Sequence, residues 1–232
     1  MRRPYYRKGK GVMLNFVVVM GAAILLGGVL LFEKKENPRG LVPFKTLLSC
    51  LFVLAALLQP HPIPRYTYFI IAGLVFCLGG DLFLALPQRK MFLLGLVSFL
   101  VGHILYIVAF SGVGMLTFWT WTGFLIVCVI SGGVYWWLKP HLGAMRGPVF
   151  CYILVITVMM SGAGSVLVNS RLNLVARIMV LLGALCFYLS DVFVARDRFL
   201  KKAFFNRLMG LPMYYTGQFL LAFSVGFVDY QG

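Results

Sequence analysis

Residues 73–85 read GLVFCLGGDLFLA, and residues 183–195 read GALCFYLSDVFVA. Both segments are apolar, begin with glycine and carry one aspartate eight positions later, Asp81 in the first and Asp191 in the second. An ionisable group at membrane depth is costly and marks a candidate functional site. The two segments therefore predict a membrane protein that presents one carboxyl group from each of two similar helices.

A second pair of segments repeats the order of the first. Residues 95–103 read GLVSFLVGH and residues 210–218 read GLPMYYTGQ, so two glycines recur seven positions apart. Four features occur in the same order in both halves: a glycine, an aspartate, a Gly-Leu pair and a further glycine. This order favours a duplicated unit over chance similarity between apolar sequences. The copies differ in length, because 22 positions separate Asp81 from His103 and 27 separate Asp191 from Gln218. The additional residues fall in the basic loop after residue 195.

Composition identifies the class of protein. Hydrophobic residues make up 61% of the 232 and charged residues 12%, whereas soluble domains have about 25% charged residues. The 21 basic residues are spread over the N-terminal tail and the short loops, a pattern typical of contact with anionic lipid headgroups. We therefore expect membrane lipids, and no nucleic acid, as partners. None of the five cysteines forms a C-x-x-C pair, so neither a disulfide framework nor a zinc site is indicated.

Eight apolar runs have about the 20 residues that a membrane-spanning helix needs. They are approximately 12–32, 41–58, 66–86, 91–111, 116–138, 148–168, 172–195 and 209–228. The loops between them carry proline, charge or both, and no Gly/Ser-rich linker occurs. We expect one all-α, polytopic transmembrane domain over 1–232, with a basic tail at 1–11. Two parallel four-helix repeats, roughly 12–111 and 116–228, would be related by an axis along the membrane normal.

The alternating direction of the helices brings the polar residues into one leaflet. Asp81 and Asp191 lie near the ends of the third and seventh expected helices, on the side opposite the N-terminus. Lys45 lies shallow in the second helix, on the same side. Each of these residues also has a structural alternative. One aspartate could cap a backbone or pair with Lys45, and the role of Lys45 could be limited to extending its ammonium group to the membrane interface. Two aspartates placed by a repeat favour a functional pair.

Further polar residues lie deeper in the same leaflet. His103 and Tyr106 share one face of the fourth expected helix, one turn apart. Tyr214, Tyr215 and Gln218 lie in the first half of the eighth. Packing roles are open for the histidine and the tyrosines. Together the set predicts a pocket with a headgroup at its mouth and a chain below.

The residue types limit the chemistry. A catalytic zinc needs about three protein ligands, and His103 is the one histidine inside an expected span, so we expect no metal. No G-x-S-x-G nucleophile motif occurs. Two carboxyl groups close together in low dielectric hold one proton between them, which supplies an acid and a base. Paired carboxyl groups of this kind cleave acetal-like bonds through oxocarbenium-like states.

Three groups of segments resemble the lysoplasmalogenase (YhhN-like) membrane family. Residues 78–84 (LGGDLFL) with 102–110 (GHILYIVAF) resemble its first signature. Residues 184–191 (ALCFYLSD), continuing to 197–199 (DRF), resemble its second, and Tyr215-x2-Gln218 with LLA at 220–222 resembles its last helix. The similarity covers the second to fourth, seventh and eighth expected helices, and the others by hydropathy alone.

The resemblance implies an eight-helix hydrolase that cleaves the vinyl ether bond of lysoplasmalogens, a class of lysophospholipid. The products would be a fatty aldehyde and glycerophosphocholine or glycerophosphoethanolamine. One of Asp81 and Asp191 would protonate the vinyl carbon, and the other would stabilise the oxocarbenium ion and activate water. No cofactor is implied.

The remaining site residues would bind the substrate. Lys45 would face the phosphate, and His103, Tyr106 and Gln218 would orient water or the ether oxygen. Tyr215 completes the predicted substrate-binding set.

A proton-coupled transporter or a lipid-binding membrane protein is the alternative, because duplicated bundles with paired intramembrane acids also carry protons and solutes. A transporter would need helix breaks at membrane depth, and the third, fourth and seventh expected helices contain no central proline. This favours the hydrolase.

Orientation follows from the basic residues. Thirteen Lys and Arg lie on the side of the aspartates and eight on the other, which favours a cytoplasmic site, although the five in the tail argue the reverse. The short tail and compact loops suggest a bacterial inner membrane.

Overall fold

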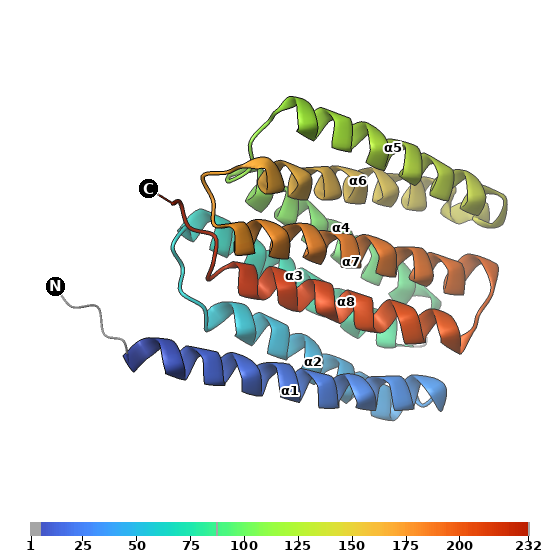
Figure 1. The fold of residues 1–232 in the computed structure, drawn as a ribbon. Helices are drawn as coiled ribbons and strands as arrows, with labels where there is room; N and C mark the ends of the chain where they lie inside the picture. Colours follow the sequence, from blue (N-terminus) through green and yellow to red (C-terminus); the bar gives the residue numbers. More distant parts are fainter. Residues whose placement is uncertain (1–5, 87, 232) are drawn as a thin grey trace.

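Eight α-helices form nearly all of the protein in a computed structural model, which describes residues 6–86 and 88–231, with the side chains of 13–86, 88 and 90–231 (Figure 1). They are α1 (Tyr6–Lys34), α2 (Pro38–Leu57), α3 (Pro64–Ala85), α4 (Arg89–Ser111), α5 (Phe118–Leu138), α6 (Arg146–Val168), α7 (Leu174–Ala195) and α8 (Phe204–Ser224). Short helices link α5 to α6, η1 (Lys139–His141) and η2 (Gly143–Met145). No strand occurs among the described residues, so the predicted all-α class is confirmed.

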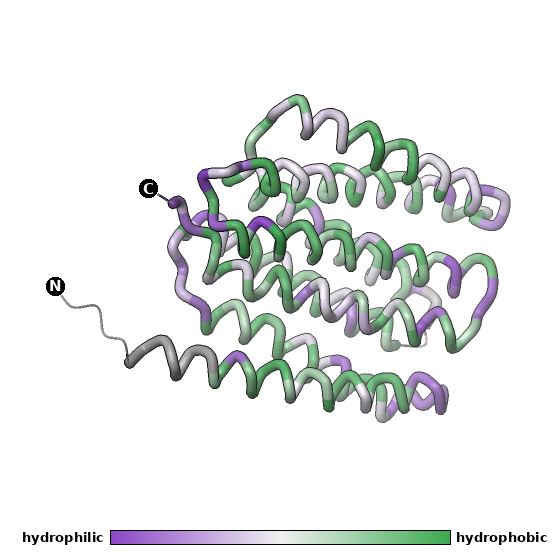
Figure 2. Tube along the Cα trace, viewed as in Figure 1, coloured by the Kyte–Doolittle hydropathy of each residue, from purple (hydrophilic) through white to green (hydrophobic). Residues whose placement is uncertain are grey.

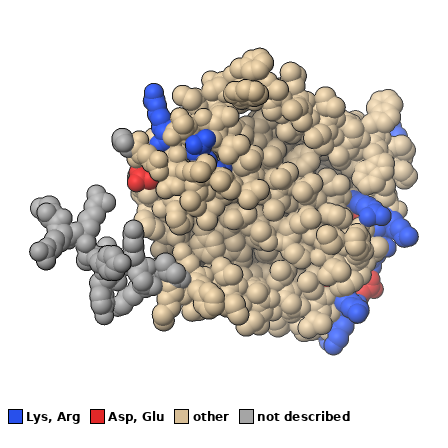
Figure 3. All heavy atoms as spheres, in the orientation of Figure 1, with Lys and Arg blue, Asp and Glu red and all other residues tan. Residues whose placement is uncertain are grey.

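Among the residues that the structure describes, seven helices, α1 to α7, are long and apolar enough to cross a membrane. Hydrophilic residues concentrate towards the helix ends (Figure 2), and on the face that Figure 3 shows Lys and Arg cluster at the two ends of the bundle with an uncharged band between them. The eighth helix, α8, has 21 residues and lies beside α7 in the bundle, but it carries more polar side chains. The chain is an integral, multi-pass membrane protein.

The observed helices follow the expected spans except at the two ends. The first begins at Tyr6 rather than 12, and the last covers Phe204–Ser224 rather than 209–228. Hydropathy misplaced the start of α8 because its first turns hold Asn206 and Arg207, whose polar groups are bonded to acidic side chains instead of water.

The glycines matched in the sequence lie at contacts between paired helices. α3 packs along α4, and α7 packs along α8. A Cβ added at Gly73 would lie 3.1 Å from the carbonyl oxygen of Gly102, and one at Gly183 would lie 3.1 Å from the carbonyl oxygen of Gly217. Small residues permit this close approach of helices in membranes. The same contact is thus made twice.

Two further observations support the duplication, which stays a prediction for the remaining helices. A Cβ at Gly95 would lie 3.4 Å from the carbonyl oxygen of Gly80, and one at Gly210 would lie 3.5 Å from that of Ser190. Each four-helix half also packs its fourth helix on the second helix of the other half, α4 on α6 and α8 on α2.

The additional length of the second copy forms a short π-helix, η3 (Arg196–Leu200), between α7 and α8. Its five residues equal the difference between the two aspartate spacings, and only residues 86–88 join α3 to α4. The α1–α2 and α7–α8 connections lie at the end of the bundle opposite the two termini (Figure 1). The candidate site lies at this end.

Candidate functional site

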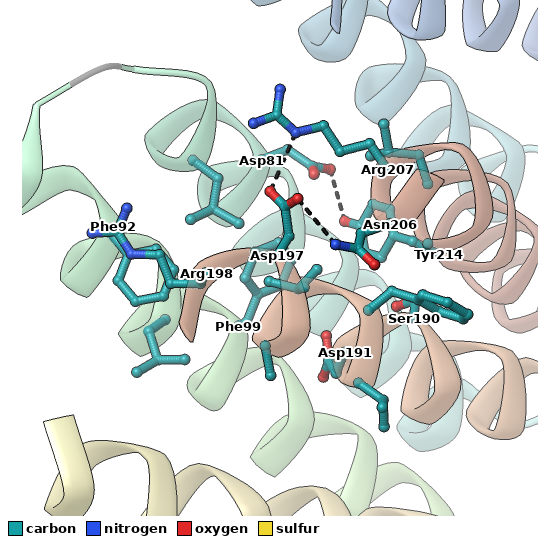
Figure 4. Close-up of a pocket in the computed structure, with 18 of the residues that line it drawn as sticks. Asp81, Phe92, Phe99, Ser190, Asp191, Asp197, Arg198, Asn206, Arg207 and Tyr214 are labelled. Atoms are coloured by element: carbon teal, nitrogen blue, oxygen red, sulfur yellow. Dashed lines mark hydrogen bonds and ion pairs between the residues drawn. The ribbon is translucent and has the colours of Figure 1, made fainter. Parts of the chain in front are cut away.

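A cavity of about 650 Å³ opens at the end of the bundle opposite the termini, and all eight helices contribute to its wall. This volume lies within the range of about 300–1,000 Å³ that is usual for small-molecule sites. Asp81 and Asp191 both line it, in agreement with the sequence, and Figure 4 shows both carboxyl groups in the same close-up.

Asp81 lies one turn from the end of α3 and is 3% exposed. Its Oδ2 accepts hydrogen bonds from the Ser49 hydroxyl of α2 at 2.6 Å and from the Tyr214 hydroxyl of α8 at 2.7 Å. The preceding Gly80 lets α4 approach, because a Cβ there would lie 2.6 Å from the ring of Phe99. Two helices, α2 and α8, therefore hold this carboxyl group, and α4 packs beside it.

Asp191 occupies the matching position on α7 and is partly buried. Its Oδ2 accepts one hydrogen bond, from the Tyr152 hydroxyl of α6 at 2.7 Å. Each aspartate thus receives a donor from the helix that precedes its own. Neither forms an ion pair within the part of the chain that the structure describes, so the alternative pairing with Lys45 is not observed.

A continuous row of four rings, the aromatic bridge, joins the two aspartates: Tyr214, Phe187, His103 and Tyr152. The ring centroids of Tyr214 and Phe187 are 5.3 Å apart, those of Phe187 and His103 4.5 Å, and those of His103 and Tyr152 5.3 Å, all edge to face. The two terminal tyrosines of the row are the hydrogen-bond donors to Asp81 and Asp191. His103 is fully buried in the middle, and neither ring nitrogen has a partner among the described residues.

The other predicted binding residues lie beneath the cavity rather than on its wall. Tyr106 donates a hydrogen bond to Oε1 of Gln218 at 2.7 Å and lies 3.7 Å from the sulfur of Cys77. Within the described chain, the Tyr215 hydroxyl and Nε2 of Gln218 have no hydrogen-bond partner. A buried polar group without a partner is destabilising. The polar atoms of this layer are therefore available to bind another molecule beneath Asp81.

Lys45 does lie on the cavity wall, where a network of charges surrounds the mouth. Its ammonium is 3.2 Å from Oε1 of Glu33, and both side chains are nearly buried. Arg207 lies 2.6 Å from the same Glu33. Arg207 also lies 3.3 Å from Asp197 of η3, as Figure 4 shows. Asn206 donates a further hydrogen bond to Asp197 at 3.3 Å.

The outer rim is exposed. The Lys202 ammonium is 2.8 Å from Glu36, and its hydrogen bond and charge lower the pKa of that carboxyl. The Arg198 guanidinium lies 4.2 Å from the centre of the Phe92 ring, a cation–π contact at the opposite side of the mouth.

Sequence reasoning missed several residues of the site. Ser49 and Tyr152 are ordinary hydroxyl residues in apolar runs, and only the fold shows that they reach the aspartates. Glu33 and Arg207 are 174 positions apart. A usable signal existed for Glu33, since it directly follows the first apolar run and is one of only six acidic residues.

No group of three or more His, Cys, Asp or Glu side chains suited to a metal ion is found among residues whose side chains are described. The site therefore offers carboxyl, hydroxyl and basic groups for chemistry. This arrangement suits proton transfer and the binding of a zwitterionic or anionic headgroup.

Comparison with known proteins agrees with the sequence signatures. The model of the YhhN family matches residues 41–225, from α2 to the end of α8, and confirms the resemblance. Lysoplasmalogenase TMEM86A of Bos taurus is 35% identical over 158 residues, 67% of this chain and 64% of that protein. The human protein of the same name is 33% identical, over 77% of each chain.

A more distant relative is bacterial. The lysoplasmalogenase of Mycobacterium tuberculosis is 28% identical over 179 residues, 75% of this chain and 64% of that protein. The matched part of the chain thus spans a little under two thirds of the bovine and mycobacterial relatives. No solved structure gives a significant match.

Proposed function

We propose that this chain, which belongs to the YhhN family, is a membrane hydrolase that cleaves the vinyl ether bond of lysoplasmalogens. The products are a fatty aldehyde and a glycerophospho-headgroup. One observation carries the proposal: two carboxyl groups from matching positions of two similar helices line one cavity of suitable size. The names of the relatives support the substrate class.

The unequal hydrogen bonding of the two aspartates supports different roles. Two hydroxyl donors on one oxygen stabilise a negative charge on Asp81. Asp191 has one donor and is more accessible, which suits a carboxyl group that gives up and regains a proton. Asp191 is therefore the acid and Asp81 the ionised partner.

The reaction begins when Asp191 transfers its proton to the vinyl carbon distal to the ether oxygen, which leaves an oxocarbenium ion facing the Asp81 carboxylate. Water then bonds to the cationic carbon as Asp81 takes its proton, giving a hemiacetal. The glycerol oxygen leaves with the proton from Asp81, and the hemiacetal hydroxyl returns a proton to Asp191. The aldehyde is released, one water is consumed, and both carboxyl groups regain their starting states.

The charged mouth would bind the headgroup. Lys45 and Arg207 both contact Glu33, and a substrate phosphate can take the place of this carboxylate as their partner. Arginine and lysine both bind phosphate, arginine with two parallel hydrogen bonds. This places the glycerol next to Asp81.

Residues beneath the cavity would support the reaction without forming its wall. His103 holds Tyr152 and Phe187 in place, so it fixes the donor to Asp191. The hydrogen bond from Tyr106 to Gln218 ties α4 to α8 below Asp81. The free polar atoms of His103, Tyr215 and Gln218 would bind water that replaces the molecule consumed.

The location of the protein is also a proposal. Short loops between the helices suit a bacterial inner membrane. The excess of basic residues at the site end suits a mouth on the cytoplasmic side.

The test compares three lysophospholipids with the same headgroup and chain length, joined through a 1-alkenyl, a 1-alkyl or a 1-acyl bond. The purified protein in detergent should release aldehyde from the alkenyl lipid and leave the alkyl lipid intact. Release of fatty acid from the acyl lipid without aldehyde from the alkenyl lipid would replace the proposal with an esterase.

A further inference from the structure

The cavity has two chemically different sides. Apart from the two aspartates, its charged residues come from α1, α2, η3, α8 and the adjoining loops, and Glu33, Lys45, Asp197 and Arg207 form a network of ion pairs there. The wall formed by α4, α5 and α6 is apolar apart from the Tyr152 hydroxyl. It includes Leu96, Val134, Leu138, Val149 and Ile153. The two aspartates lie on α3 and α7, which complete the wall.

In the two halves, α1 corresponds to α5 and α8 corresponds to α4. The space between α1 and α8 can therefore be compared with the space between α5 and α4. The first is closed, because α1 packs against α8 and the Glu33–Arg207 ion pair joins them. At the second, α4 and α5 both pack on α6, but their described residues make no extended contact with each other. Leu96 of α4 and Val134 of α5 nevertheless line one cavity.

The short helix η3 bounds this second gap on the side of the mouth. Phe199 packs edge to face on Phe92 of α4, with ring centroids 6.1 Å apart. It also packs against the apolar cluster of Leu138, Leu142 and Val149 at the ends of α5 and α6. Arg198 of η3 lies over the outer Phe92 ring as the one cation at this border. The other residues named at the gap beneath η3 are apolar, whereas the route through the mouth passes ion pairs.

α5 lies at the edge of the bundle (Figure 1), where a membrane-spanning helix faces lipid. α5 leaves most of its surface uncovered, with Leu125 64% and Val129 76% exposed. Apolar groups are more favourably placed in such surroundings than in water. A hydrocarbon chain in the bilayer can reach the cavity here without meeting a charged side chain on the apolar wall.

We infer that the gap between α4 and α5, below η3, is a lateral portal that binds the hydrocarbon chain of a single-chain ether lipid. The chain passes between Leu96 and Val134 into the bilayer core, and the headgroup lies at the opposite, charged side of the cavity. The vinyl ether bond is then held between the two aspartates. The inference rests on the proposed function for the identity of the lipid, and it assigns the direction in which the lipid lies.

The first test narrows the portal. Leu96→Trp and Val134→Trp add bulk at its two borders, and Val97→Trp and Val129→Trp are matched controls at exposed positions outside the cavity wall on the same helices. For a long-chain lysoplasmalogen, kcat/KM should fall by at least about tenfold in the portal variants, the scale of a steric mismatch in an apolar pocket. In the portal variants the loss on a short-chain, water-soluble vinyl ether should be clearly smaller than the loss on the long-chain lipid, and the two controls should change neither rate. Equal losses on both substrates, or equal effects of the portal and control variants, would overturn the portal.

The second test does not depend on hydrolysis. A 1-alkyl lysophospholipid with a photoreactive diazirine partway along its chain, at the part that would lie in the portal, should label α4 and α5 near residues 96 and 134 in the parent protein, and an excess of unlabelled lipid should prevent this. Labelling confined to α1 and α8, or labelling that unlabelled lipid does not reduce, would contradict the portal. Labelling at α4 and α5 by a protein that releases no aldehyde would keep the portal and reject the proposed reaction.

Discussion

Asp81 and Asp191 stand at matching positions of α3 and α7, yet their surroundings differ in the number and source of hydrogen-bond donors. Ser49 and Tyr214 both donate to Asp81, whereas Tyr152 is the one donor to Asp191 in the described part of the chain. Asp81 is also the more deeply buried. A repeated scaffold can thus place two identical groups symmetrically while the neighbouring helices make them chemically unequal.

The largest expected effect follows from removing either member of the pair. Asp81→Asn and Asp191→Asn should each lower the rate of aldehyde release by about 10²–10⁴-fold, the usual contribution of a general acid or base. Asparagine keeps the size and the hydrogen-bond acceptor, so Tm in detergent should stay close to that of the parent. Retained activity in one variant would show that this aspartate takes no part in the reaction.

The closed gap between α1 and α8 predicts the next effect. Glu33→Gln leaves Lys45 and Arg207 without their shared partner, and loss of one member of a buried ion pair costs about 3 kcal/mol. Thermal unfolding should show a clear fall in Tm. Glu36→Gln is the matched control, since its pair with Lys202 is fully exposed and its loss should leave Tm unchanged. Similar Tm values for the two variants would argue against this role of Glu33.

The glycine contacts that occur once in each half predict a smaller effect. In Gly217→Ala the new Cβ would lie 2.7 Å from the carbonyl oxygen of Gly183, and such overpacking costs about 1–3 kcal/mol. Gly132→Ala on α5 meets no atom within 4 Å and should be neutral or slightly stabilising. The measurement is Tm of both variants. A neutral Gly217→Ala would show that the α7–α8 contact is looser than the structure indicates.

The sequence predicted what repetition and hydropathy encode. It identified the all-α class, the helix positions and the placement of both aspartates in one cavity, because each depends on residues close together in the chain or on the match between copies. It also predicted Lys45 on the cavity wall. The other predicted substrate-binding residues lie beneath the cavity rather than on its wall: His103, Tyr106, Tyr215 and Gln218. Depth in the membrane does not distinguish residues that line a cavity from residues packed beneath it.

Partners from distant helices could not be predicted in the same way. Tyr152 donates to Asp191 from a helix in which the sequence shows no repeat match, and Glu33 meets Arg207 across nearly the whole chain. Such hydroxyl and charged side chains become site residues only because the fold brings distant helices together, so the sequence alone does not identify them.

The pH profile of kcat/KM tests the unequal pair most directly, in Tyr214→Phe and Tyr152→Phe. Removing the donor to Asp81 makes that carboxylate easier to protonate, so the acidic limb should move to higher pH in Tyr214→Phe. Removing the donor to Asp191 favours the protonated form of this acid, so the basic limb should move to higher pH in Tyr152→Phe. Each shift should be about one pH unit, the scale of one hydrogen bond to a charged group. If the two variants moved the opposite limbs, or both moved the same limb, the assignment of Asp191 as acid and Asp81 as ionised partner would be wrong.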